Sequence, residues 1–174
     1  DNAFRELMGC VVDGVTLSIP STKFKAEGAL LVTHWGISGP ATLKLSSRAA
    51  RHLHEHAYQE TISVNWVNER NCSILEEKLK DIIAKFPQKQ LTNVHPFGLP
   101  ARLWQYLTRN SGFAPERKWA EIGKKGINKL VETLTNDCYC TNGKGTYKEE
   151  FVTCGGISLK SIDPNTLESR SCPG

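Results

Sequence analysis

The chain has 174 residues, of which 39% are hydrophobic and 23% are charged, values typical of folded globular proteins, so the composition excludes extensive disorder. No apolar run approaches the ~20 residues of a membrane-spanning helix, and we expect no membrane contact. The formal charge of +4 arises from 22 basic and 18 acidic residues that are spread along the chain. A nucleic-acid-binding domain typically has clustered basic residues, so we expect no nucleic-acid partner.

The first part of the chain predicts strands and one helix. Residues 10–20 carry β-branched side chains around Asp13-Gly14, a dipeptide typical of a hairpin turn. The short apolar run at 28–34 predicts a buried strand, and the helical spacing of apolar residues predicts a helix over 43–56. Strict alternation of apolar and polar residues at 60–67 predicts a half-buried strand.

A helical segment follows. Ser73 and Glu76 have the spacing of a capping box, and the apolar residues after them predict a helix that ends before Pro87. Further helices are expected at residues 99–109, 119–122 and 126–134, where apolar side chains again recur at helical intervals.

Strand character returns at the end of the chain. Residues 137–141 and 148–154 predict two strands, joined by a turn that contains Asn142-Gly143. We therefore predict an α+β fold in which a small β-barrel-like subdomain is interrupted by an inserted helical subdomain. The β-rich part, with one helix, covers residues 1–70 and 137–174, and the helical part covers 71–136.

The stretch from Leu31 to Ala41 is the most informative part of the chain. An apolar run leads into Thr-His-Trp, turns through Gly36 and Gly39, and restarts at Pro40, a residue that suits the first turn of a helix. The pattern predicts a strand, a tight loop and a helix. Such a loop can present backbone N–H groups and a positive helix end to an anion or a cofactor edge, although an ordinary strand-to-helix turn has the same pattern.

A second glycine loop lies near the end of the chain. The motif FVTCGGI at 151–157 is followed by TLESR at 166–170 and by Pro173-Gly174. Together with THWGISGP at 33–40, these motifs resemble the BaiN-like (aminoacetone-oxidase-type) family of bacterial FAD-dependent oxidoreductases. The resemblance runs along most of the chain, and it implies a β-barrel and a helical subdomain inserted between the halves of an FAD domain.

The resemblance also implies a function. The chain would be the insert domain of a longer flavoprotein, would cover the flavin and shape the substrate cavity, and would not be catalytic alone. Because the sequence contains no G-x-G-x-x-G fingerprint, we expect FAD in the full-length parent and no tight FAD binding by this chain. The expected partners are the remainder of its own chain, including the FAD-binding domain, and an unidentified small-molecule substrate.

Two loops carry the candidate cofactor-binding residues that the resemblance implies. The residues are Thr33, His34, Gly36, Ser38 and Gly39 in the first loop, and Thr153, Cys154, Gly155 and Gly156 in the second. The second loop also looks like the glycine-pair loop of fumarate-reductase-like flavoproteins, which commonly have a histidine just before it. Here Phe151-Val152 stands in that place, so we assign no catalytic residue.

The histidines and cysteines predict neither a metal site nor disulfides. On a helix, His52 and His56 share a face while His54 points elsewhere, and the order of Glu55 and His56 differs from that of an H-E-x-x-H zinc motif. We expect a solvated helix end there. The six cysteines are scattered through the chain, which predicts free thiols in a reducing cytoplasm.

A different class of function stays open beside the flavoprotein interpretation. The helices around 119–134 are joined by a glycine-containing turn at 123–126, and such turns can contact phosphates through backbone N–H groups. The alternative is a non-enzymatic binding module that contacts a protein or RNA partner.

Overall fold

The computed structural model describes residues 2–145 and 156–172. Its strands are β1 (Val11–Ser18), β2 (Lys25–Val32), β3 (Ile37–Ser38), β4 (Thr61–Asn65) and β5 (Asp137–Cys140). Its α-helices are α1 (Asn2–Arg5), α2 (Pro40–Arg48), α3 (Ala50–Glu55), α4 (Cys72–Lys85), α5 (Ala101–Asn110) and α6 (Gly123–Thr135). Three short 3₁₀ helices, η1 (Leu91–Asn93), η2 (Pro96–Gly98) and η3 (Trp119–Glu121), lie between them.

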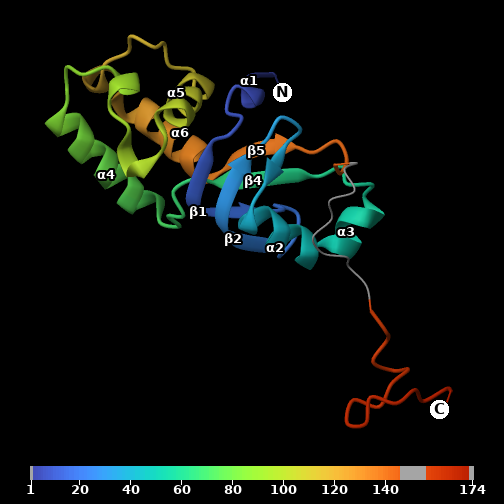
Figure 1. The fold of residues 1–174 in the computed structure, drawn as a ribbon. Helices are drawn as coiled ribbons and strands as arrows, with labels where there is room; N and C mark the ends of the chain where they lie inside the picture. The colour runs from blue at the N-terminus through green and yellow to red at the C-terminus, as the bar shows by residue number, and fades with distance from the viewer. Residues whose placement is uncertain (1, 146–155, 173–174) are drawn as a thin grey trace.

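The five strands form one curled antiparallel sheet, a half-barrel, in the order β3-β2-β1-β4-β5 (Figure 1). The last two strands of this order are far apart in the sequence, yet Thr61 pairs with Cys140 and Val64 with Asp137. The helical segment between β4 and β5 therefore leaves the sheet and returns to it. This arrangement confirms the predicted α+β class with a small barrel-like sheet.

The predicted hairpin turn at Asp13-Gly14 is wrong. Strand β1 continues through both residues, and its pairing with β2 shifts in register between Val12 and Val15, which marks a β-bulge. Gly14 has φ +66. A glycine with positive φ serves a bulge as well as a turn, so the dipeptide alone does not separate the two.

The predicted capping box of the first long helix is also wrong. Helix α4 starts at Cys72, and the side chain of Asn71 caps it by accepting a hydrogen bond from the backbone N–H of Ser73 at 3.0 Å. Asn is among the best N-cap residues because its short side chain reaches the free N–H groups of the first turn. The predicted end before Pro87 is confirmed, since α4 ends at Lys85.

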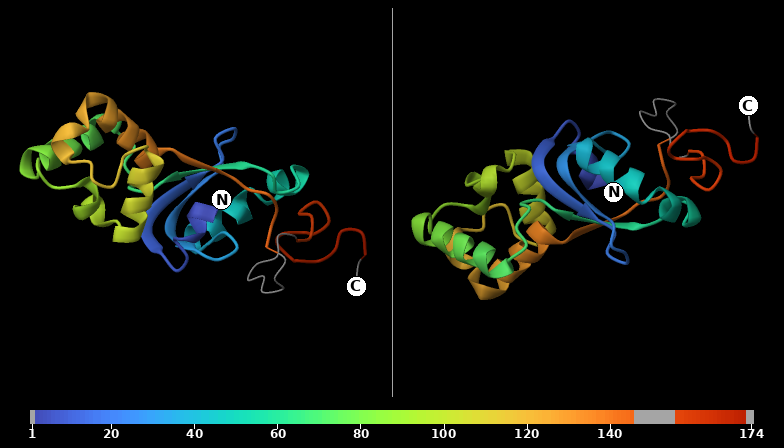
Figure 2. Two further views of the ribbon diagram at one scale, coloured as in Figure 1. Left: turned by 90° about the horizontal axis from the view of Figure 1, so that it is seen from above. Right: turned by 90° about the horizontal axis from the view of Figure 1, so that it is seen from below.

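The helices lie on two sides of the sheet. Helices α4, α5 and α6 gather on one side, whereas α2 and α3 lie on the other (Figures 1 and 2). Helix α6 packs against α4 and α5 and contacts β4 and β5, and α2 packs on β2. Within the described ranges, no helix combines the length and the apolar character needed to cross a membrane.

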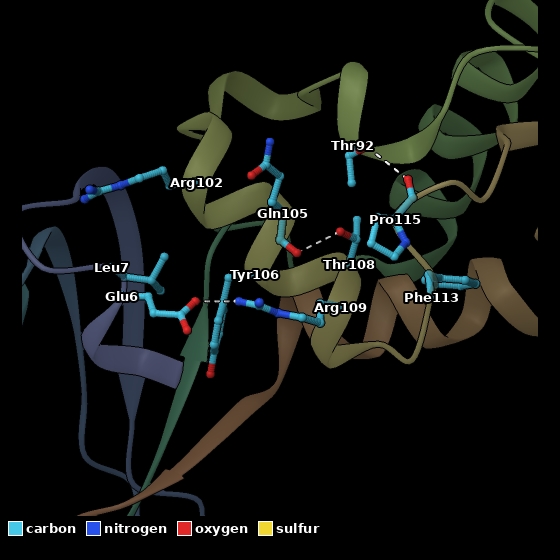
Figure 3. A pocket seen from close by; sticks show the side chains of 10 residues that line it. All are labelled: Glu6, Leu7, Thr92, Arg102, Gln105, Tyr106, Thr108, Arg109, Phe113 and Pro115. Carbon is cyan, nitrogen blue, oxygen red and sulfur yellow. Dashed lines mark hydrogen bonds and ion pairs between the residues drawn. The ribbon is translucent and has the colours of Figure 1, made fainter. Parts of the chain in front are cut away.

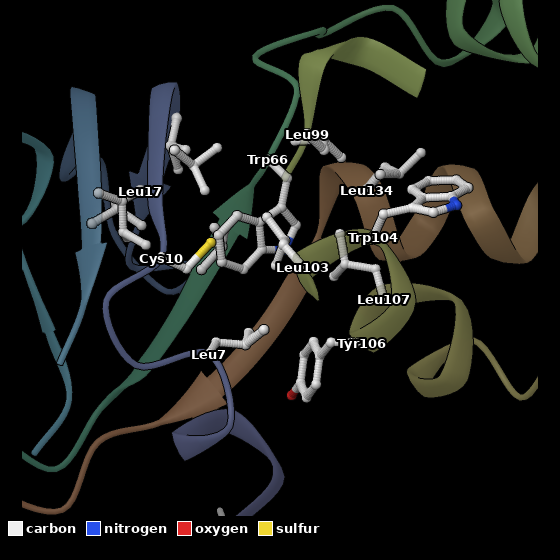
Figure 4. Close-up of a cluster of buried hydrophobic side chains, with 14 of the residues drawn as sticks. Leu7, Cys10, Leu17, Trp66, Leu99, Leu103, Trp104, Tyr106, Leu107 and Leu134 are labelled. Atoms are coloured by element: carbon white, nitrogen blue, oxygen red, sulfur yellow. The ribbon is translucent and has the colours of Figure 1, made fainter. Parts of the chain in front are cut away.

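One apolar core joins the sheet to the helices (Figure 4). Trp66, directly after β4, is 1% exposed and lies between strand residues such as Leu17 and helix residues such as Leu103. Its backbone N–H donates to the carbonyl of Leu134, at the end of α6, at 2.9 Å. The boundaries of the two subdomains at 70 and 137 stay a prediction.

Candidate functional site

The loop that begins at Thr33 is a tight hairpin turn between β2 and β3. The backbone N–H of Thr33 donates to the carbonyl of Gly36 at 2.8 Å, and the N–H of Gly36 donates to Oγ1 of Thr33 at 3.1 Å. His34 and Trp35 form the tip, where Trp35 is 47% exposed. The expected direct step from loop to helix is therefore wrong, because Ile37 and Ser38 first pair with β2 as strand β3.

Helix α2 follows at once, with Pro40 in its first turn as predicted. Gly39 has φ 97 and ψ 173, a conformation that is essentially restricted to glycine. A Cβ at Gly39 would lie 2.8 Å from the carbonyl oxygen of Ala29, and a Cβ at Gly28 would lie 3.0 Å from the backbone nitrogen of Ala41. These two glycines let the start of α2 pack directly on β2, so this end of the helix faces its own sheet.

The second candidate loop is only partly described. Thr153, Cys154 and Gly155 lie outside the described residues, while Gly156 is exposed and has open space around it. The proposed proximity of the two loops to a flavin stays a prediction.

A cavity of about 430 Å³ opens between the first residues of the chain and α5 (Figure 3). Helix α5 contributes Arg102 and Arg109, which are seven residues apart and project from the same side of the helix. Arg102 donates to the carbonyl of Met8 at 2.7 Å, and Arg109 forms an ion pair with Glu6 at 2.8 Å. Sequence reasoning missed this cavity, although the seven-residue spacing of two arginines beside buried leucines was a usable signal.

A buried polar network lies behind the cavity. The carboxylate of Asp137 accepts hydrogen bonds from Tyr139 at 2.5 Å and from the indole N–H of Trp66 at 2.9 Å. The hydroxyl groups of Tyr139 and Tyr106 lie 3.3 Å apart, and Tyr106 also lines the cavity. Burial raises the pKa of Asp137 above its usual value, and its hydrogen bonds with Tyr139 and Trp66 partly oppose this shift. Burial also raises the pKa of Tyr106 and of Tyr139. The network fixes α5 and β5 to each other.

Positive charge is concentrated in the helical segment. Residues 71–136 contain eleven Lys and Arg residues and six Asp and Glu residues, so this segment accounts for the positive charge of the whole chain. Lys124 and Lys125 are exposed in the first turn of α6, directly after Gly123, whose φ is +59. Exposed cations at the positive end of a helix favour a polyanionic partner.

The histidine motif has the geometry that the sequence predicts, with one addition. His52 and His56 lie side by side, with ring centroids 4.2 Å apart, and His54 is exposed. The structure adds Glu60, whose carboxylate lies 2.6 Å from Nε2 of His52. Sequence reasoning missed this third residue, which lies just beyond the helix.

The cysteines described by the structure are free thiols, as predicted. Cys10 is buried, and the exposed ones are Cys72, Cys138, Cys140 and Cys172. Burial raises the pKa of the Cys10 thiol, so this group stays protonated more readily than an exposed thiol.

The comparisons with known proteins identify the family. A family model described as "HI0933-like protein barrel and H2TH domain" matches residues 1–152. The chain belongs to this family. The match covers the half-barrel and the helical segment together, and it makes the chain a domain related to FAD-dependent oxidoreductases.

Three curated relatives align with nearly the whole chain. The ribosomal RNA dihydrouridine synthase of Escherichia coli K12 is 30% identical over 97% of the chain, and that of Haemophilus influenzae is 28% identical over 94%. The 3-dehydro-bile acid delta(4,6)-reductase of Clostridium scindens is 26% identical over 98%. The alignments cover 39%, 39% and 42% of these relatives, so the chain spans about two fifths of their length.

Proposed function

We propose that this domain engages ribosomal RNA within a longer, FAD-dependent protein that reduces uridine to dihydrouridine, and that it also covers the flavin. The observation that carries the proposal is the alignment of nearly the whole chain with two relatives named ribosomal RNA dihydrouridine synthase. The BaiN-like resemblance supports the flavin part, as does the alignment with a bile-acid reductase.

The charge distribution supports RNA as the partner. From the sequence we expected no nucleic acid, because the cluster of Lys124, Lys125 and Lys129 on one predicted helix is typical of a solvated face, and that expectation remains untested. The surplus of basic residues over acidic ones nevertheless lies in 71–136. Phosphate contacts by Lys and Arg supply the sequence-independent part of a protein's affinity for nucleic acid and make that affinity dependent on salt. Lys124 and Lys125 are the exposed cations that we assign to such contacts.

The chemistry of the proposed reaction divides the tasks between cofactor and protein. Reduction of the uracil C5=C6 bond adds a hydride to one carbon and a proton to the other, and reduced flavin supplies the hydride when bound. The residues of this chain bind the RNA, orient the base and exclude water.

The hairpin tip fits a flat ring better than it fits a pyrophosphate. Trp35 is 47% exposed, and a Cβ at Gly36 would meet nothing within 4 Å, so backbone and indole can lie close to a planar group. The sequence has no dinucleotide fingerprint, and the start of α2 faces β2, so we assign the pyrophosphate contacts to the rest of the longer protein.

A second candidate is the reduction of a small polycyclic substrate, which the relationship to the bile-acid reductase favours. The cavity of about 430 Å³ beside α5 has the size of a small-molecule site and includes Leu7, Tyr106 and Phe113 among its lining. This candidate predicts that Tyr106→Ala changes the KM for a steroid enone without changing RNA binding.

The RNA proposal is tested by the binding of unmodified ribosomal RNA to the 174-residue chain at several salt concentrations. The double variant Lys124→Glu, Lys125→Glu should bind more weakly, and its salt dependence should fall by about one unit of slope for each lost phosphate contact. Lys23→Glu, an exposed reversal outside the helical segment, is the matched control. Equal losses in both variants, or no RNA binding by the chain, would contradict the proposal.

A further inference from the structure

Three side chains with metal-ligating atoms converge where α3 ends and β4 begins. His52 belongs to α3, His56 is the C-cap residue directly after that helix, and Glu60 directly precedes β4. One ligand atom from each of these residues lies within 4.8 Å of the other two. Neither the cavity nor the hairpin tip includes any of the three, so this cluster is independent of the proposed function.

The distances suit a small cation. Nε2 of His52 lies 2.6 Å from Oε1 of Glu60, and Nδ1 of His56 lies 3.8 Å from the same oxygen. Zinc bound tetrahedrally at about 2.0–2.1 Å from each ligand separates the ligand atoms by about 3.3 Å. The two observed distances lie on either side of this value, so small side-chain rotations bring the atoms into place.

The surroundings hold these side chains in position. The backbone N–H of Glu60 donates to Oγ1 of Thr141 at 3.0 Å, and the N–H of Thr141 donates back to the carbonyl of Glu60 at 2.8 Å. Nδ1 of His56 donates to the carbonyl oxygen of His52 at 2.8 Å, so zinc binding at this nitrogen requires loss of that proton and a rotation of the ring away from the carbonyl.

Burial leaves one side of the cluster open. The side chains of His52 and Glu60 are 20% and 12% exposed, whereas that of His56 is 50% exposed. A cation can therefore reach the cluster from solvent without a change in the fold.

We propose that His52, His56 and Glu60 form a zinc site with three protein ligands and a fourth position open to water or another ligand. Imidazole and carboxylate groups are ligands that zinc accepts readily. The site would tie the end of α3 to the start of β4 across a short connection. Ala57 and Tyr58 of that connection have φ 52 and 57, a strained conformation for residues other than glycine, and a bound cation would stabilise it.

The test uses the 174-residue chain freed of metal with a chelator. Titration with Zn²⁺ by calorimetry should show one equivalent bound, and Zn²⁺ should raise the melting temperature. Titration with Co²⁺ should give the visible spectrum of a tetrahedral or five-coordinate site without the near-ultraviolet absorption of cobalt bound to thiolate. This spectrum separates the cluster from the exposed cysteines of the chain.

Three variants and one control decide the assignment. His52→Ala, His56→Ala and Glu60→Gln should each weaken zinc binding by at least about tenfold, as loss of a ligand requires. His54→Ala, the exposed histidine between the two ligands, should bind zinc like the parent. Because His56 is half exposed, His56→Ala should keep the circular dichroism of the metal-free parent, so a loss of binding in it does not reflect unfolding.

Several results would overturn the assignment. These are the absence of stoichiometric zinc binding, binding that survives His56→Ala, an equal loss in His54→Ala, and a cobalt spectrum dominated by thiolate ligands. Each of them would leave the cluster as a hydrogen-bonded His-Glu pair.

Discussion

Replacing Gly39 with alanine should destabilise the fold by several kcal/mol. The backbone of Gly39, with φ 97 and ψ 173, is in a region where a residue with a side chain is strained by about 1–3 kcal/mol. The added Cβ would also lie 2.8 Å from the carbonyl oxygen of Ala29, in the middle of β2. Because that atom belongs to a paired strand, relieving the contact requires backbone movement, and overpacking of this kind costs about 1–3 kcal/mol more.

The expected total for Gly39→Ala is about 2–6 kcal/mol, a large part of the roughly 5–15 kcal/mol that stabilises a typical domain. Urea unfolding of the chain, followed by circular dichroism, measures it. Gly112→Ala is the control for strain alone, because Gly112 has φ +83 and nothing within 4 Å of its Cβ position, and it should cost about 1–2 kcal/mol. Gly28→Ala tests crowding alone, since its Cβ would meet Ala41 at 3.0 Å.

The reasoning is refuted if Gly39→Ala is no more destabilising than Gly112→Ala. Such a result would mean that α2 can move away from β2 at little cost. The glycine in the THWGISGP motif would then have to be explained by contact with a ligand, rather than by the packing of helix on strand.

Three further predictions concern buried groups. Because burial raises the pKa of Asp137 above 3.8, the folded state holds its proton more tightly than the unfolded state. Its contribution to stability is complete below that value and is lost as the pH rises through the raised pKa. The loss of unfolding free energy caused by Asp137→Asn, measured by urea unfolding, should therefore become smaller as the pH rises. A loss that does not change with pH would contradict this account. Trp104→Phe should cost at least about 1 kcal/mol more than Trp119→Phe. The Trp104 indole donates to the carbonyl of Leu91 at 2.6 Å, whereas the buried Trp119 indole N–H has no hydrogen-bond partner among the described residues. Equal unfolding free energies for the two variants would contradict this prediction. In the folded chain, Cys10 should react with a thiol reagent far more slowly than the exposed cysteines, whereas in urea it should react at the same rate as they do. Alkylation followed by mass spectrometry measures both rates. Fast labelling of Cys10 in the folded state would contradict its burial.

Helices α4, α5 and α6 were predictable because their signal is local, whereas the single helix predicted over 43–56 is divided at Ala49 into α2 and α3, and the helix predicted at 119–122 is the 3₁₀ helix η3. Leu103 and Leu107 on α5, and Leu130 and Leu134 on α6, recur at the spacing of one helical turn and are all buried. The strand β4 was predictable from its alternation for the same reason, although the predicted exposed face is wrong, because Ser63 on that face is 5% exposed. These patterns need no knowledge of distant parts of the chain.

The misinterpreted features depend on contacts between distant residues. Gly14 is locally consistent with a turn, and only the pairing of β1 with β2 makes it part of a bulge. The contact of Gly39 with Ala29, the ion pair of Arg109 with Glu6, and the approach of Glu60 to His52 all arise from tertiary packing. The sequence could therefore identify the loop and the histidine pair, but not the partners that complete them.

Formation of dihydrouridine by the longer protein tests the proposed function most directly. The protein that contains this domain is incubated with FAD, a reductant and unmodified ribosomal RNA, and the nucleosides are analysed by mass spectrometry. The account predicts a uridine that gains two hydrogens, with less product from the variant Lys124→Glu, Lys125→Glu and unchanged product from Lys23→Glu. An RNA that stays unreduced while a steroid enone is reduced would contradict the account.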